Sequence, residues 1–211
     1  QGEFWRFGFF VEGDQNTHCK QTATAAHIYG KKLAAAESLT AVGRDWRFLN
    51  DSPDVFKPLI DRAFCEGINQ IVFHTSVCHR KQDGLPGIEY NAGTQFNPNM
   101  TWWQLAARPW LDYVNRSQAL LQSGLFAADV LYYNGDWAPN LVPPKHTPAG
   151  LGKGYDYDVC NEEVLLTRLS VKDGKIVLPD GMSYRVLVLP DSTKMPAPVA
   201  QKLRELVQAG A

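Results

Sequence analysis

The sequence has no excess of charge of either sign and no long apolar run. Its 211 residues include 21 basic and 22 acidic side chains, a formal net charge of −1, whereas nucleic-acid binders and polybasic membrane-surface proteins usually have a basic excess. No apolar run approaches the roughly 18–20 residues that cross a bilayer. We therefore expect neither nucleic acid nor a membrane as a partner. An apolar fraction of 45% with 20% charged residues is typical of a globular protein.

Several binding and catalytic motifs are also missing. No glycine-rich phosphate-binding loop follows an apolar run, which argues against a nucleotide site, and no Gly-x-Ser-x-Gly elbow is present to indicate an α/β-hydrolase. The cysteines show no Cys-x-x-Cys spacing, and their apolar neighbours predict buried free thiols rather than a zinc site or disulfides. They are Cys19, Cys65, Cys78 and Cys160.

Apolar runs and helical patterns alternate along the first 169 residues. Strands are expected at residues 32–40, 69–75 and 127–133, and helices at residues 14–29, 52–66, 102–123 and 161–169. Each strand is a nearly continuous apolar run, which is typical of parallel strands covered by helices. We therefore expect residues 1–169 to be the C-terminal part of a (β/α)8 TIM barrel, an α/β fold that needs about 250 residues when complete. An open doubly wound sheet is the alternative.

The pattern changes at about residue 170. Asp173 and Gly174 separate two short alternating segments and predict a β-hairpin. A strong strand is expected at residues 184–190 and a helix at residues 197–208. Residues 170–211 are therefore expected to begin a second α/β domain, with strand partners beyond residue 211. The chain starts with Gln1 and not with Met, and we expect it to be an excerpt of a longer protein.

Each expected strand of the first part ends near a residue that could do chemistry: Glu37, His74 and Asp136. In (β/α)8 barrels, side chains at these strand ends form the active site. Glycosidases use two carboxyl groups there, one as proton donor and one ionised, and Glu37 and Asp136 match this pair. A helix cap or a loop salt bridge is the alternative for either carboxylate. His74 could bind a sugar hydroxyl, act as a base, or bond a backbone carbonyl.

Two tryptophans at a loop–helix junction and two aspartates in a loop are further candidates for substrate binding. Trp102 and Trp103 could form a platform for a sugar ring, or they could anchor a helix to the core. Because adjacent helical residues point in different directions, we expect one of the two in the core. Asp156 and Asp158 could contact substrate or a hard cation such as calcium, or they could be solvated loop carboxylates.

Nine segments stand in an order that is also found in a known family. They are residues 25–31 (AAHIYGK), 35–38 (AAES), 63–69 (AFCEGIN), 72–75 (VFHT), 96–97 with 101–103 (FN and TWW), 129–133 (DVLYY), 154–161 (GYDYDVCN), 178–182 (LPDGM) and 184–190 (YRVLVLP). Together they resemble the α-L-rhamnosidases of glycoside hydrolase family 106. The resemblance covers nearly the whole chain, so it is far more specific than any single motif.

The resemblance implies a large multidomain enzyme with a (β/α)8 catalytic barrel that removes terminal α-L-rhamnose from oligosaccharides or glycosides with inversion. It also implies calcium at the active site and a periplasmic or extracellular location. Glu37 lies in the motif of the family's general acid. Asp136 follows Gly135 where the family has a Glu as base, so the side chain is shorter by a methylene. This departure keeps two alternatives open: a non-catalytic carbohydrate-binding or scaffold module, and a glycosidase for another sugar.

Overall fold

The structure is a computed structural model, and it describes residues 2–5, 18–40, 52–78, 80–84, 96–100, 102–135, 141–143, 151–152 and 154–211. The chain divides into two compact units, Gln1–Thr22 with Leu33–Ser123 and Ala23–Lys32 with Gly124–Ala211. Residues 169 and 170, where the sequence predicts a domain boundary, both lie in the second unit. That boundary stays a prediction.

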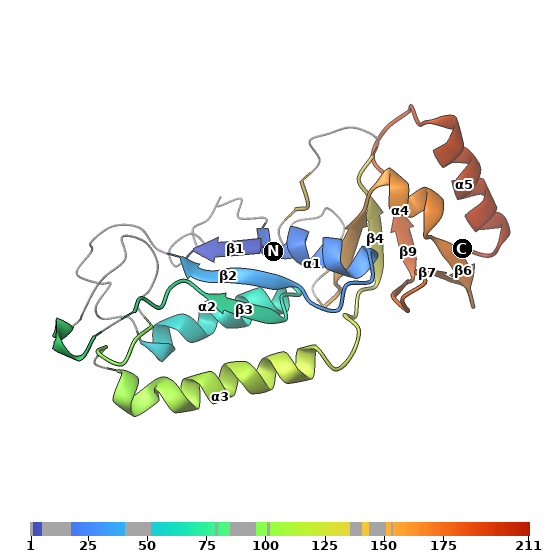
Figure 1. Cartoon of the computed structure of the whole chain (residues 1–211). Coiled ribbons are helices and arrows are strands. Elements are labelled where there is room, and N and C mark those ends of the chain that lie inside the picture. Colours follow the sequence, from blue (N-terminus) through green and yellow to red (C-terminus); the bar gives the residue numbers. More distant parts are fainter. Residues whose placement is uncertain are drawn as a thin grey trace. The chain divides into compact units, whose positions relative to one another are not determined.

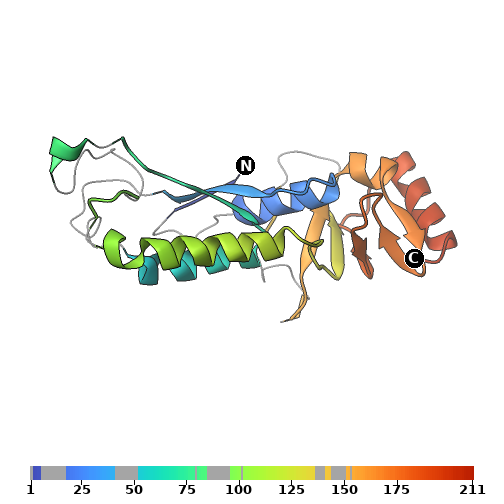
Figure 2. The ribbon, with the colours of Figure 1, turned by 60° about the horizontal axis from the view of Figure 1, so that its bottom comes forward.

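The first unit contains a parallel sheet of three strands, β1 (Gly2–Trp5), β2 (Ala35–Thr40) and β3 (Gln70–Phe73), in that order. Two helices, α2 (Pro53–Cys65) and α3 (Trp103–Leu121), run beside the sheet and contact β2 and β3 (Figures 1 and 2). A 3-10 turn, η2, spans Lys81–Asp83. In β1 and β2, fully buried residues such as Phe4 and Ala36 stand next to residues with partial exposure, such as Glu37, whereas every residue of β3 is at least partly exposed. One face of the sheet is therefore packed and the other is accessible within this unit.

The second unit is built on two sheets. A parallel sheet has the order β5 (Tyr157–Cys160), β4 (Val130–Tyr133), β9 (Val186–Val188). An antiparallel sheet joins β6 (Ser170–Lys172), β7 (Lys175–Val177) and β8 (Ser183–Tyr184). Helices α4 (Glu162–Thr167) and α5 (Ala197–Gln208) contact each other, and the residues of α1 (His18–Ile28) from Ala23 onward also belong to this unit.

Local sequence signals explain where several of these elements begin and turn. The Asn161 side chain caps α4 by accepting a hydrogen bond from the Val164 backbone N–H at 3.0 Å. Pro53 occupies the first turn of α2, where its missing N–H costs nothing. Asp173 and Gly174 both have positive φ, 53° and 69°, as the tight hairpin turn between β6 and β7 requires. The core of the second unit forms around Leu131, Tyr184 and other fully buried side chains.

The alternation of helices with parallel strands is confirmed, and the fold is mixed α/β. The parallel strands form two separate three-stranded sheets, and the partial TIM barrel stays a prediction. Two expectations are wrong. Asp158 is expected in a loop, yet it lies in β5, which begins at Tyr157. The strand of residues 184–190 was expected to pair beyond residue 211, yet β9 pairs with β4.

Among the described residues, no helix has the length and apolarity that crossing a bilayer requires.

Candidate functional site

Glu37 lies in the middle of β2, because the strand continues past it to Thr40. It is in register with Glu3 of β1 on one side and with Val72 of β3 on the other. In-register neighbours in a parallel sheet point to the same face, so these three side chains share one face. The exposed fraction of the Glu37 side chain is 36%. A carboxyl group with this exposure is accessible for proton exchange with a ligand.

His74 directly follows β3, as the sequence predicts, and lies beside Glu37. Its Nε2 is 3.9 Å from Glu37 Oε1, and its backbone N–H donates to the Ser38 carbonyl at 3.1 Å. The backbone bond holds the end of β3 against β2, so the imidazole stays near the carboxylate. At 3.9 Å the two groups interact through charge when the histidine is protonated, and they are too far apart for a direct hydrogen bond. Glu37 and His74 are thus brought together.

Asp136 lies outside the described residues. The strand that precedes it, β4, is followed by Asn134 and by Gly135, whose φ is +89°. These residues belong to the second unit, whereas Glu37 belongs to the first. The pairing of Glu37 with Asp136 stays a prediction.

The two adjacent tryptophans have different environments, as expected for neighbours on a helix. Trp102 has an exposed fraction of 8%, and its ring packs edge-on against Phe56 and Phe96 at 5.8 and 6.3 Å. It therefore fits the alternative of a core anchor. Trp103, the first residue of α3, is partly exposed, with its ring 5.4 Å from that of Trp102. Of the pair, Trp103 has the ring surface that a sugar could contact.

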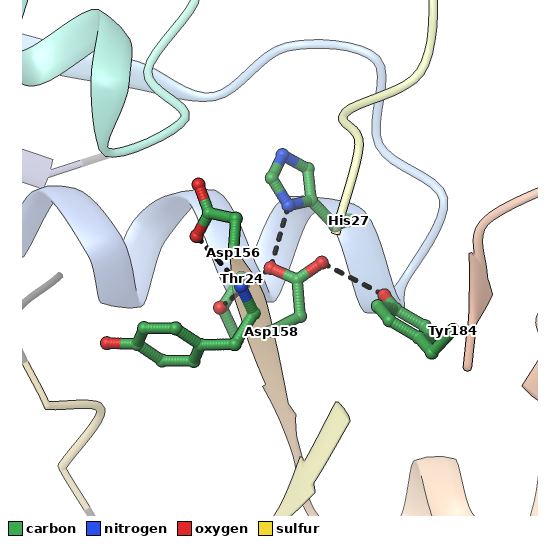
Figure 3. Close-up of polar contacts among 6 residues, drawn as sticks. Thr24, His27, Asp156, Asp158 and Tyr184 are labelled. Carbon is green, nitrogen blue, oxygen red and sulfur yellow. Dashed lines mark hydrogen bonds and ion pairs between the residues drawn. The ribbon is translucent and has the colours of Figure 1, made fainter. Parts of the chain in front are cut away.

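Asp158 is not a solvated loop carboxylate but a fully buried residue of β5 (Figure 3). Its Oδ1 accepts a hydrogen bond from the Thr24 hydroxyl at 2.9 Å and lies 2.9 Å from His27 Nδ1. Its Oδ2 accepts a hydrogen bond from the Tyr184 hydroxyl at 2.9 Å. Burial, and then the neighbouring Asp158, raise the pKa of Tyr184, so its hydroxyl remains a donor. The network joins α1, β5 and β8, and we assign it a structural role.

Asp156 differs from Asp158 in its surroundings. Its side chain is partly exposed, and its Oδ1 accepts a hydrogen bond from the Tyr157 backbone N–H at 2.8 Å (Figure 3). That bond orders the backbone where β5 begins. Contact with substrate stays a prediction for this residue.

Three comparisons with known proteins all match glycosidases, although the sugars in their descriptions differ. The sequence profile of glycoside hydrolase family 106, α-L-rhamnosidase, matches residues 1–211. The chain belongs to this family. A solved rhamnosidase from Novosphingobium sp. PP1Y superposes with a TM-score of 0.83 at 33% identity, over 100% of this chain and 20% of that one. A protein of Formosa agariphila described as a putative beta-glucuronidase is 37% identical over 99% of this chain. The chain spans 17% of that relative's length.

Calcium, which the family resemblance implies, prefers six to eight oxygen ligands. In the first unit, Glu3 and Glu37 are two carboxylates on neighbouring strands that face the same side, which are too few by themselves to enclose calcium. In the part of the chain that the structure describes, no group of three or more acidic, histidine or cysteine residues could enclose a metal. Asp158 is unsuited to this role because both of its oxygens already accept hydrogen bonds.

Sequence reasoning missed Glu3 and the three partners of Asp158. The sequence signal for Glu3 is weak: it is an acidic residue between a glycine and two aromatic residues in the short segment GEFW, which forms β1. The partners Thr24, His27 and Tyr184 are distant from Asp158 in sequence, and no local pattern connects them. None of the four cysteines forms a disulfide, but only Cys19 and Cys160 are buried, so the expectation of buried thiols is wrong for Cys65 and Cys78.

Proposed function

We propose that the protein containing this chain hydrolyses glycosides with a terminal α-L-rhamnose, and that Glu37 donates the proton to the departing glycosidic oxygen. Family membership over the whole chain, together with the rhamnosidase structure that superposes on it, supports this proposal. The single most direct observation is the partly exposed carboxyl of Glu37, 3.9 Å from the His74 imidazole on a shared sheet face. A general acid must reach the leaving oxygen of the ligand, and the exposure of Glu37 allows this.

Asp136 is the proposed general base, because it follows Gly135 where the family has its second carboxylate. A base that activates water on the face opposite to the acid gives inversion at the anomeric carbon. Proton NMR of the first-formed rhamnose distinguishes β-L-rhamnose, the inverted product, from α-L-rhamnose. Accumulation of α-L-rhamnose before mutarotation would remove the assignment of Asp136.

Calcium is part of the proposal through the family resemblance. Glu37 must keep a proton to act as the general acid, so it is not a ligand in this proposal. Glu3, in register with it on β1, is the described carboxylate that could bind a cation near this face, where the cation would supply positive charge to orient sugar hydroxyls. Dialysis against a calcium chelator is expected to lower rhamnosidase activity, and re-addition of calcium is expected to restore it.

A second candidate substrate is a β-glucuronide, because the 37% identical relative is described as a putative beta-glucuronidase. Uronates have a carboxylate and rhamnose does not, so the two substrates demand different pocket charges. A panel of aryl glycosides, assayed on the full-length protein, separates these candidates. Faster release from the α-L-rhamnoside supports our proposal, and faster release from the β-D-glucuronide favours the alternative. Sugar binding without release from any glycoside would support a non-catalytic carbohydrate-binding module.

A further inference from the structure

A cavity of about 360 Å³ lies in the second unit at the amino ends of two parallel strands. Asp129 directly precedes β4 and Arg185 directly precedes β9, and both line the cavity. All of its described lining residues fall within Gly124–Ala211, in one compact unit. Asn134 and Gly135, which lead to the proposed base, follow the carboxyl end of β4. The cavity is therefore at the other end of this strand.

Backbone hydrogen bonds hold Asp129 and Arg185 next to each other. The Asp129 carbonyl accepts from the N–H groups of Arg185 at 2.7 Å and Val186 at 3.2 Å. The Asp129 N–H donates to the Asp156 carbonyl at 3.0 Å. The backbone of both charged residues is thus ordered before any ligand binds, which lowers the free energy that binding must spend on ordering.

The charged part of the lining has an excess of positive charge. Lys175 of β7 is the third charged residue there, so two cations face one carboxylate among the described lining residues. Arg185 Nε lies 3.5 Å from Asp129 Oδ1, and a guanidinium has further N–H donors on its two terminal nitrogens. The Arg185 side chain is 71% exposed, so a ligand can reach these donors. This arrangement favours a ligand with a carboxylate, which arginine can bind through two parallel hydrogen bonds.

The rest of the lining is mainly apolar. Phe126 and Ala128 pack against the core of the second unit, and Met182 is part of that core. Leu125 is 61% exposed and lies close to Gly181, where an added Cβ would be 2.9 Å from the Leu125 Cδ1. A ligand with an apolar face would remove this leucine surface from water, which is favourable. The apolar wall is anchored in the core and needs no rearrangement to receive such a face.

The size of the cavity limits the ligand to a small molecule. Its volume is near the lower end of the roughly 300–1,000 Å³ that is typical of small-molecule sites, so it suits one sugar residue. A uronate combines a ring with C–H groups, several hydroxyls and a carboxylate. These three features match the apolar wall, the Asp129 carboxylate and the two cations in turn.

We propose that this cavity binds one sugar residue that carries a carboxylate, a uronate of an acidic glycan. Arg185 and Lys175 bind the carboxylate, Asp129 accepts hydrogen bonds from ring hydroxyls, and Leu125 covers a C–H face of the ring. The choice of a sugar as the ligand rests on the proposed function. The preference for an anion rests on the charges of the lining.

Hydrogen exchange of the full-length protein, titrated with D-glucuronate, tests this site locally in peptides that cover residues 124–129 and 181–185. D-glucose, which has a hydroxymethyl group in place of the carboxylate, is the matched neutral ligand. Arg185→Gln removes a cation of the lining, and Ala127→Trp fills the cavity from an exposed lining position. Arg204→Gln is the matched control, because it removes the same charge from an exposed position of α5 outside the lining.

We expect glucuronate to slow exchange in these peptides in a saturable way, and glucose to need at least about tenfold higher concentrations. The Kd for glucuronate should rise about tenfold in Arg185→Gln, as loss of a hydrogen bond to a charged group predicts. Ala127→Trp should abolish the protection, and Arg204→Gln should leave it unchanged. Equal protection by glucose would overturn the proposal. So would unchanged protection in both cavity variants at an unchanged melting temperature.

Failure of the proposed function has a different signature from failure of this site. If the wild-type protein releases no rhamnose from aryl rhamnosides while glucuronate still protects the cavity peptides, the proposed function fails and the anion site stands. If the protein turns over rhamnosides and glucuronate gives no protection in these peptides, the site is refuted and the proposed function stands.

Discussion

At the scale of single residues, the proposed chemistry depends most on the carboxyl group of Glu37. The variant Glu37→Gln keeps the size of the side chain and removes the transferable proton. We expect rhamnosidase kcat/KM of the full-length protein to fall about 10²–10⁴-fold, the range typical for loss of a general acid. Glu205→Gln, on the exposed face of α5, is the matched control and should retain activity. The fall in kcat/KM should be smaller for an aryl rhamnoside with a very good leaving group, because such a group departs with less help from a proton donor. Equal losses for good and poor leaving groups would argue against the proton-donor role.

Asp158 is predicted to matter for stability and not for chemistry. The Asp158 carboxylate accepts hydrogen bonds from Thr24, His27 and Tyr184. In Asp158→Asn, an N–H₂ group replaces one of the two accepting oxygens and faces a donor, so at least one of these bonds is lost. Loss of a hydrogen bond to a buried charge costs about 1.5–3 kcal/mol. Tyr184→Phe removes one such bond and should cost an amount in this range, and Asp158→Asn, which affects the bonds to all three partners, should cost at least as much.

Hydrogen exchange of the full-length protein measures both effects locally, in peptides that cover β5 and β8. Faster exchange is expected there in Asp158→Asn, with a smaller change in Tyr184→Phe. The exposed Asp191→Asn change should leave the same peptides unaltered. A large loss of kcat with unchanged exchange would instead place Asp158 in the catalytic machinery.

The four thiols should differ in reactivity. Burial, reinforced by Glu66, raises the pKa of Cys19, and burial raises the pKa of Cys160 to about 12. Cys65 and Cys78 are exposed. At pH 8 we expect iodoacetamide to modify Cys65 and Cys78 within minutes and to leave Cys19 and Cys160 protected, as peptide mass spectrometry can show. Rapid labelling of Cys160 in the native protein would contradict its burial.

The same pKa shift predicts a loss of stability in alkali. The pKa of a thiol in the unfolded chain is about 8.5, whereas burial raises the pKa of Cys160 in the folded protein to about 12. Between these values the folded state binds more protons, so the free energy of unfolding decreases as the pH rises. The stabilisation is complete below about pH 8.5. Replacing Cys160 with Ala should therefore make the melting temperature less dependent on pH in that range.

At the scale of elements, the end of α1 depends on Gly30. Its φ is +66°, and the Gly30 and Lys31 N–H groups bond back to the carbonyls of His27 and Ala26 at 3.1 and 2.7 Å. A Cβ at this position would overlap with the Asp180 carboxyl group, which pairs with Arg168. Gly30→Ala thus combines backbone strain with a steric clash.

Gly84 separates the two effects, because its φ is +72° and nothing lies within 4 Å of an added Cβ. We expect Gly84→Ala to cost about 1 kcal/mol for the backbone alone. Gly30→Ala should cost about 1–3 kcal/mol more, as overpacking does. Thermal unfolding of the two variants makes the comparison. Equal costs would show that Asp180 moves aside freely.

The elements themselves were largely predictable, because their signals are local. The helix at residues 197–208 is observed with the predicted bounds as α5, and the Asp173–Gly174 turn joins β6 to β7 as predicted. By contrast, β5 was missed because Asp158 interrupts its apolar run, and only its three hydrogen-bond partners make a carboxylate tolerable in a buried strand. Those partners come from distant parts of the sequence.

Parts of the candidate site were predictable for the same reason. His74 was placed at a strand end from a short apolar run, and the structure adds that it lies 3.9 Å from Glu37. The position of Glu3 beside Glu37 depends on the pairing of β1 with β2, whose register is a long-range property. Sequence patterns predict which residues alternate on a strand, but they do not align one strand with another.

At the scale of the whole molecule, the chain spans 17% and 20% of the two relatives compared with it, and we predict that residues 1–211 expressed alone are inactive and poorly stable. In the part of the chain that the structure describes, β1 and β3 each pair with β2 only, so each leaves an open edge that favours aggregation. Large apolar side chains are also exposed, including Leu105 at 87% and Leu120 at 75% on α3.

Expression of residues 1–211 beside the full-length protein tests this prediction. Light scattering and thermal unfolding should show an aggregating chain without a cooperative transition, and the aryl rhamnoside assay should show turnover by the full-length protein alone. The reason is physical: the accessible face that holds Glu3, Glu37 and Val72 needs neighbouring strands or ligand-binding loops to exclude water and orient a sugar. A soluble monomer that unfolds cooperatively and releases rhamnose would show that these 211 residues form a complete catalytic domain.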